Sequence, residues 1–140
     1  MQIGIKDASS YFKGLLLLIR KDHRVTEQEN SLLMRIGKSL GFEKEFCESA
    51  IKEILRNKYI EDAPPEFSSQ EVAVMFIRDG LALAFCDGRI DRKEEKWIRA
   101  VAARNRIDQE WITAEIEKAG ANSSFPDKLE ADKMSIVHSS

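Results

Sequence analysis

The sequence predicts an all-α fold: a single domain of six to seven helices and no sheet, made of two three-helix repeats related by a pseudo-two-fold axis. The length of 140 residues suits one domain, and the share of hydrophobic residues, 43%, is too high for a disordered chain. Apolar residues recur at helical spacing along nearly the whole chain. The same pattern returns at a fixed offset without a gap, so that Asp22 corresponds to Asp87, which indicates an internal duplication.

Two helices open the first half. The first follows Ser9 and Ser10, two candidate N-caps, and its apolar stripe consists of Phe12, Leu15, Leu16 and Ile19. The second opens at Thr26, whose hydroxyl can accept a backbone N–H while Glu29 reaches back, a spacing typical of a capping box. Gly41 ends this helix, because glycine readily takes the left-handed conformation that follows a helix.

A third helix and a linker follow. One face of this helix is apolar and consists of Phe46, Ala50, Ile51, Ile54 and Leu55. Pro64 and Pro65 then break the periodic pattern, since proline removes a backbone donor and clashes with the preceding turn.

The fourth helix, from Val72 to Cys86, is apolar on nearly every side, which predicts a central, buried helix. Ser68 and Glu71 are a candidate capping box at its start. Asp79 interrupts its apolar side. Because an unpaired buried carboxylate is costly, we expect Asp79 to have a hydrogen-bond partner; a role as a ligand is the alternative.

Two further helices complete the second half. Asp91 is the expected N-cap of the fifth helix, with Glu94 three residues later. Asp108 is the expected cap of the sixth helix, which ends at Gly120. The sequence beyond it has weak periodicity, and we expect it to fray.

The two halves correspond position by position. The Asp-His-Arg-Val segment at 22–25 falls on the Asp-Gly-Arg-Ile segment at 87–90, and Glu29 falls on Glu94. The single domain, residues 1–140, thus divides into repeat one at about 10–58, a linker at 59–67, repeat two at about 68–120 and a flexible C-terminal tail at 121–140.

The corner that ends at Glu94 has part of the spacing of a calcium-binding EF-hand loop. With Gly88 as the sixth residue of such a loop, Glu94 is the twelfth. Leu83 and Phe85 then occupy the first and third ligand positions, and neither has a side-chain oxygen, so a full EF-hand is excluded. A helix–turn–helix corner with a capping box explains Asp91 and Glu94 without any ligand.

Carboxylates at the two corners nevertheless form a candidate metal site. The candidate ligands are Asp22, Glu29, Asp87 and Glu94, with Asp79 and Asp91 as secondary candidates. If the corners meet across the pseudo-two-fold axis, the four carboxylates converge, and their hard oxygen atoms suit Mg²⁺, Ca²⁺ or Mn²⁺. If the corners lie at far ends of the molecule, the same residues are four solvated acids.

A family resemblance rests on the second corner. The segment Ala-Phe-Cys-Asp-Gly-Arg-Ile-Asp at 84–91, followed by Glu94, resembles the TerB-like family, named for tellurite resistance. The similarity covers residues 12–118 and is strongest at 81–107, whereas the first half has His23 where glycine is usual. The resemblance implies an all-helical fold of two related halves, a divalent-metal site at the corners, and a cytoplasmic bacterial module linked to stress resistance and often accessory to membrane proteins.

Composition and motifs exclude several functions. The net charge of −2 argues against nucleic acid as a partner, and the longest apolar run is too short for direct membrane insertion. Cys47 and Cys86 are far apart in the sequence, which indicates two ordinary thiols in a reducing cytosol. The sequence contains no Ser-His-Asp arrangement, phosphate loop or nucleotide fingerprint, so we expect no enzyme.

Two hypotheses about function remain. The first is a non-enzymatic cytoplasmic TerB-like module, associated with stress or tellurite resistance, that binds a divalent cation through the corner carboxylates. The alternative is a structural interaction or oligomerisation adaptor without a metal. The expected partner is a protein. The family resemblance is compatible with a membrane-associated partner, and a homodimer is left open.

Overall fold

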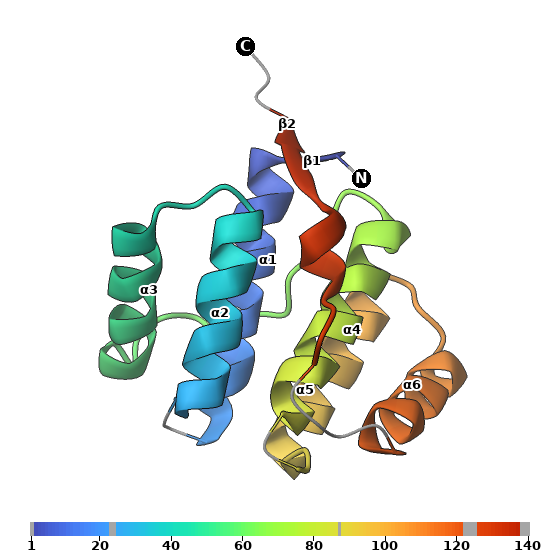
Figure 1. The fold of residues 1–140 in the computed structure, drawn as a ribbon. Coiled ribbons are helices and arrows are strands. Elements are labelled where there is room, and N and C mark those ends of the chain that lie inside the picture. Colours follow the sequence, from blue (N-terminus) through green and yellow to red (C-terminus); the bar gives the residue numbers. More distant parts are fainter. Residues whose placement is uncertain (1, 23–24, 87, 122–125, 138–140) are drawn as a thin grey trace.

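The computed structural model describes residues 2–22, 25–86, 88–121 and 126–137, and its body consists of α-helices (Figure 1). Within these ranges there are six: α1 (Ile5–Ile19), α2 (Glu27–Ser39), α3 (Lys44–Arg56), α4 (Gln70–Phe85), α5 (Arg92–Arg104) and α6 (Gln109–Ala121). Two short 3-10 helices, η1 (Arg20–Asp22) and η2 (Glu130–Lys133), and two strands, β1 (Gln2–Gly4) and β2 (Ser135–Val137), complete the described chain. The predicted all-α class is confirmed.

α1 and α4 lie side by side at the centre of the body, with α2 and α3 on one side and α5 and α6 on the other (Figure 1). This position explains why α4 is apolar nearly all round and why the last residues of α1, from Leu15 to Ile19, are all buried. Gly80 of α4 allows close packing, because a Cβ at this position would lie 3.2 Å from Cδ2 of Leu18 in α1. The predicted central, buried helix is confirmed.

The helix starts agree with the predicted capping boxes at Thr26 and Asp91, and they differ from the N-caps predicted for α1 and α4. Thr26 and Asp91 are the N-caps of α2 and α5, each with a complete capping box. The N-caps predicted for α1, Ser9 and Ser10, lie inside that helix. α1 begins at Ile5 because the buried residues Asp7, Ala8 and Tyr11 extend its buried stripe toward the N-terminus.

The start of α4 is shifted by one residue from the prediction. Ser69, and not Ser68, is the N-cap, and its hydroxyl accepts the N–H of Val72 at 3.3 Å. Ser68 instead donates its hydroxyl and its backbone N–H to the carboxylate of Asp7 in α1. This tertiary contact determines which of the two adjacent serines caps the helix.

The expectation of a fold without a sheet is wrong at the chain ends. β1 and β2 form a two-stranded parallel ladder in which Gln2 pairs with Ser135 and Gly4 pairs with Val137. Each strand has three residues, so neither is long enough to show an alternating pattern in the sequence. The ladder joins segments from opposite ends of the chain.

The C-terminal segment, residues 126–137, packs on the body and does not form the frayed tail that the sequence predicts. It crosses the molecule between α2 and α4 (Figure 1). Leu129, Ala131 and Met134 are buried there. Three apolar residues in a short irregular segment give no helical period, which is why the sequence did not indicate this packing.

The helix bounds follow the predicted offset. Glu27 and Arg92, which open α2 and α5, are as far apart in the sequence as Asp22 and Asp87, and the same holds for Lys44 and Gln109, which open α3 and α6. The four helices α2, α3, α5 and α6 all have 13 residues. The sequence repeat therefore coincides with a repeat in secondary structure.

Candidate functional site

The acidic residues at the two corners act as helix caps where the structure describes them. Glu29 accepts the backbone N–H of Thr26 at 2.9 Å, and Thr26 Oγ1 accepts the N–H of Glu29 at 3.1 Å. Glu94 accepts the N–H of Asp91 at 3.0 Å, and Asp91 in turn accepts the N–H of Lys93 at 2.6 Å. Glu29 and Glu94 are only 2% and 3% exposed, so both carboxylates are held inside the corner.

The other two proposed metal ligands lie outside what the structure describes: the side chain of Asp22 and the whole of Asp87. The described side chains include no group of three or more His, Cys, Asp or Glu residues arranged to hold a metal ion. The four-carboxylate metal site therefore stays a prediction.

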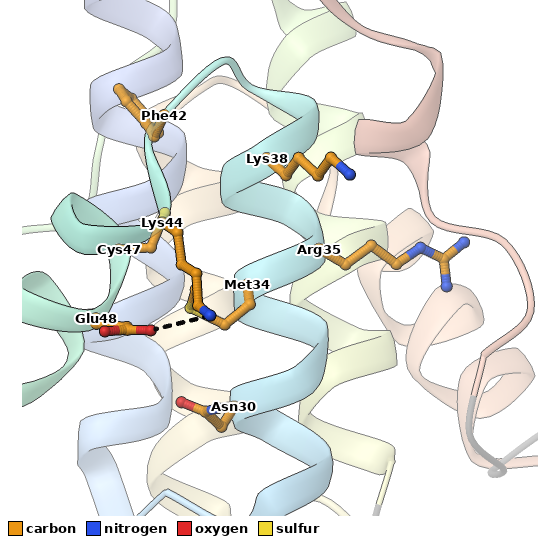
Figure 2. A pocket seen from close by; sticks show the side chains of 8 residues that line it. All are labelled: Asn30, Met34, Arg35, Lys38, Phe42, Lys44, Cys47 and Glu48. Carbon is orange, nitrogen blue, oxygen red and sulfur yellow. Dashed lines mark ion pairs between the residues drawn. The ribbon is translucent and has the colours of Figure 1, made fainter.

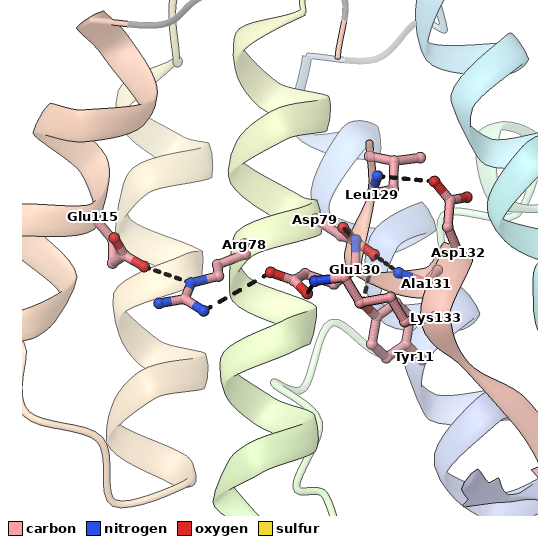
Figure 3. Close-up of polar contacts among 9 residues, drawn as sticks. All are labelled: Tyr11, Arg78, Asp79, Glu115, Leu129, Glu130, Ala131, Asp132 and Lys133. Atoms are coloured by element: carbon pink, nitrogen blue, oxygen red, sulfur yellow. Dashed lines mark hydrogen bonds and ion pairs between the residues drawn. The ribbon is translucent and has the colours of Figure 1, made fainter. Parts of the chain in front are cut away.

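Asp79, the secondary candidate in α4, is the centre of a buried polar cluster (Figure 3). Its carboxylate accepts the hydroxyl of Tyr11 at 2.6 Å and the backbone N–H groups of Glu130 and Ala131 at 2.6 and 2.9 Å. The side chain is 1% exposed. The predicted partner of this buried aspartate is thus a set of three donors from α1 and from the start of η2.

Burial dominates the electrostatics of this cluster. It raises the pKa of Asp79 to about 6, although the three hydrogen bonds oppose this change by favouring the ionised carboxylate. Burial, followed by the negative charge of Asp79, raises the pKa of Tyr11 well above its ordinary value. Tyr11 therefore keeps its proton and remains a hydrogen-bond donor at neutral pH. For Asp79, by contrast, neutral pH lies close to the raised pKa.

Ion pairs surround the same segment (Figure 3). Arg78 pairs with Glu115 of α6 at 2.7 Å and with Glu130 at 3.8 Å. On the other side, Arg35 of α2 binds the carboxylate of Asp132 at 2.5 and 3.2 Å. The C-terminal segment is therefore attached to both halves of the molecule, and the Asp79 carboxylate beneath it is almost completely shielded from solvent.

Sequence reasoning identified Asp79 but not its donors. Tyr11 carries a weak signal, because it is the one buried residue of α1 that has a hydroxyl group. Glu130 and Ala131 contribute only backbone N–H groups, which leave no mark in the sequence.

A cavity of about 600 Å³ lies between α2 and α3 (Figure 2). It is lined by Asn30, Met34, Arg35, Lys38, Phe42, Lys44, Cys47 and Glu48. Lys44 lies across it and pairs with Glu48 at 3.9 Å. Cys47 is buried, and burial raises the pKa of its thiol, so it lacks the thiolate character that a nucleophile needs.

A second hollow, about 290 Å³ in volume, separates α1 from α3 and is almost wholly apolar. We call it the α1/α3 groove. It is lined by Ser9, Lys13, Leu16, Phe42, Phe46, Ala50, Glu53, Ile54 and Ile60. The ring of Phe46 is 54% exposed beside it, and packs against Phe42 with ring centroids 5.1 Å apart. Large apolar side chains on a surface of this kind mark interaction sites.

Comparisons of the chain with family models, with curated proteins and with solved structures give no match. The resemblance to the TerB-like family consequently stays a prediction. None of the helices in the described residues combines the length and the apolar character that crossing a bilayer requires.

Proposed function

We propose that the chain consists of two repeats related by a pseudo-two-fold axis, as the resemblance to the TerB-like family implies. Such an axis requires that a contact between two residues be matched by a contact between their counterparts in the other repeat. Tyr11 contacts Asp79, and their counterparts are Phe76 and Gly14. A Cβ on Gly14 would lie 2.8 Å from the ring of Phe76, so the reciprocal contact exists.

Contacts between residues at equivalent positions of the two repeats support the same axis. The rings of Tyr11 and Phe76 have centroids 5.4 Å apart and meet edge to face. Leu15 and Gly80 are also counterparts, and a Cβ on Gly80 would lie 3.8 Å from Cδ2 of Leu15. Both pairs belong to the contact between α1 and α4, where we place the axis.

We propose that this duplicated module is a non-enzymatic interaction domain that binds an amphipathic helix of a protein partner in the α1/α3 groove. The observation that carries the proposal is the exposure of Phe46 beside an apolar hollow between two helices. Lys13 on α1 and Glu53 on α3 line opposite sides of the groove, and this pair of opposite charges favours one orientation of the bound helix.

The adaptor hypothesis is favoured over the cation hypothesis by the roles of Glu29 and Glu94. Both carboxylates are buried and accept the backbone N–H of their own N-cap, so capping already accounts for their position. The non-enzymatic character is supported by Asp79 and Cys47, since the first is inaccessible and fully hydrogen-bonded and the second is a buried thiol. The cytoplasmic setting and the link to stress or tellurite resistance rest on the resemblance alone.

Site-specific photo-crosslinking in the cells that produce the chain tests this function. A photoreactive residue at Ala50 lines the groove, whereas one at Lys52 is on the opposite side of α3 and is the control. We expect one defined protein adduct at Ala50, suppressed by Phe46→Asp, and none at Lys52. The absence of an adduct at Ala50, or the same adducts at both positions, would refute the proposal. A circular dichroism melting curve verifies that Phe46→Asp remains folded.

A further inference from the structure

A third hollow, about 300 Å³ in volume, lies where the start of α5 meets η1 and the linker. We call it the lysine pocket. It is lined by Lys21, Asp62, Lys93, Lys96, Trp97 and Ala100. Three ammonium groups and one carboxylate therefore surround it.

The single acid of the lysine pocket is already engaged. Asp62 forms ion pairs with Lys21 and with Arg20, the latter at 3.3 Å. With the residues that the structure describes, neither Lys93 nor Lys96 forms an ion pair, although both side chains are exposed. The pocket therefore holds more positive charge than its own carboxylate balances.

The positive charges affect one another. The side chain of Lys21 is only 14% exposed. Burial lowers the pKa of Lys21, and the positive charges of Arg20 and Lys93 lower it further. A cation held in this way gains stability when a negative charge enters the pocket.

The start of α5 makes the charge excess more unusual. Lys93 is in the first turn of this helix, where the macrodipole disfavours cations and favours anions. Lys93 donates its backbone N–H to Asp91 within the capping box, so the cap itself does not need the ammonium group. An anion in the pocket would offset both the dipole and the mutual repulsion of the lysines.

The other repeat provides an internal comparison. In the first repeat, the counterparts of Lys93, Lys96 and Trp97 are Gln28, Ser31 and Leu32. The counterpart of Lys21 in the second repeat is Cys86. None of these counterparts is charged. Because α2 and α5 have the same length and the same type of cap, the fold does not require the lysines.

We propose that the lysine pocket binds the phosphate group of a small molecule. Lysine binds phosphate as a point charge, and Lys21, Lys93 and Lys96 provide more than one such charge for a dianion. Trp97 and Ala100 supply an apolar wall for the organic part of the molecule. The volume is at the lower end of the range of small-ligand sites, about 300–1,000 Å³.

Trp97 makes the pocket directly observable. The chain has two tryptophans, so Trp111→Phe leaves Trp97 as the only indole emitter. Titration with pyrophosphate, at an ionic strength held constant with chloride, should give a saturable change in its fluorescence. The variant Lys93→Gln with Lys96→Gln should weaken the apparent affinity at least about tenfold.

Matched controls separate a site from general electrostatics. Lys38→Gln with Lys52→Gln removes the same charge from exposed positions on α2 and α3 and should leave the affinity unchanged. The proposal fails if fluorescence does not saturate below about 10 mM pyrophosphate, or if both double variants lose affinity equally. It also fails if the lysine-dependent binding occurs only to vesicles of phosphatidylcholine with phosphatidylglycerol, since the phosphate would then belong to a membrane.

Discussion

Burying the carboxylate of Asp79 costs free energy, and yet this residue specifies a tertiary contact. Its carboxylate loses nearly all hydration, and three donors replace the lost water. The counterpart in the first repeat is Gly14, which a proline of the linker approaches: a Cβ on Gly14 would lie 3.2 Å from Cγ of Pro65. The same position thus accepts an apolar segment in one half and binds backbone N–H groups in the other.

The raised pKa of Asp79 predicts a specific pH dependence of stability. Because the folded-state pKa is about 6 and the unfolded value is lower, protonation favours the folded state. The contribution of Asp79 is fully present below the unfolded pKa and is lost as the pH rises through about 6. Relative to Asp79→Asn, the wild type should lose on the order of 2 kcal/mol of unfolding free energy between pH 4 and pH 7.

Urea denaturation of the wild type and Asp79→Asn across this pH range checks the prediction. Tyr11→Phe is the companion variant, because its loss of a donor should raise the pKa of Asp79 further and move the transition to higher pH. A constant difference between wild type and Asp79→Asn at every pH would contradict the argument.

The two N-caps provide a second prediction at the scale of single residues. Thr26→Ala and Asp91→Ala each remove the side-chain acceptor of a complete capping box. Each change should lower the unfolding free energy by about 1 kcal/mol. Thermal or denaturant unfolding measures this, and Ser9→Ala, inside α1, is the control that should have a smaller effect. Equal losses in all three variants would indicate that the caps have no special role.

At the scale of elements, α3 is held to the body mainly through α2. Gly37 of α2 faces Cys47 of α3, and a Cβ at this glycine would lie well inside the contact distance of the Cys47 sulfur. Next to Cys47 in the same helix, Phe46 is exposed beside the α1/α3 groove. Close packing of α3 against α2 therefore lies directly beside an open surface of the same helix.

Gly37→Ala tests this close packing. In an open helix position the change should stabilise by about 1 kcal/mol, because alanine is the better helix former. Against Cys47 it should destabilise by about 1–3 kcal/mol through overpacking. In a Cys47→Ala background the larger part of the penalty should disappear, and a smaller part should remain because Cε1 of Phe12 lies 3.2 Å from the same Cβ. A double-mutant cycle of denaturation measurements reveals both parts. An unchanged penalty in that background would mean that another neighbour is responsible.

At the scale of the whole molecule, the two proposed repeats have their helices at the same sequence offset and differ in the chemistry of equivalent positions. Glycine corresponds to aspartate at 14 and 79, and glutamine corresponds to lysine at 28 and 93. We expect an experimental structure to superpose residues 12–55 on 77–120 with the two corners aligned. If the domain is duplicated, the two halves share their apolar packing, and only one half has the polar groups that form a given site.

The corner carboxylates give the prediction that distinguishes the adaptor from the cation hypothesis. If capping is the whole role of the corners, millimolar Ca²⁺, Mg²⁺ or Mn²⁺ should leave the melting temperature unchanged. A cation bound only by the folded state would raise it with concentration. Thermal unfolding of the wild type and of the double variant Asp22→Asn with Asp87→Asn distinguishes the two hypotheses. If the cation raises the melting temperature of the wild type but not that of the double variant, the cation hypothesis is restored.

Local patterns in the sequence were sufficient for most of the secondary structure. The capping boxes at Thr26 and Asp91 depend on residues three positions apart, and the apolar periodicity of α4 extends over several turns. Such short-range features are visible in one sequence because the groups that interact are near one another in the chain. The same reasoning indicated that Asp79 is buried and has a partner, since an apolar helix face leaves a carboxylate no water.

What the sequence by itself determined about this protein is its helical class and the bounds of most helices, whereas the division into two repeats stays a prediction. Only the tertiary structure decided which groups meet: Tyr11 and the N–H groups of η2 at Asp79, the two chain ends in one ladder, and Lys21 beside Lys93. These contacts join residues far apart in the chain. The groups that meet are backbone groups or single side chains, which leave no periodic pattern in the sequence. The packing of the helices therefore determines these contacts.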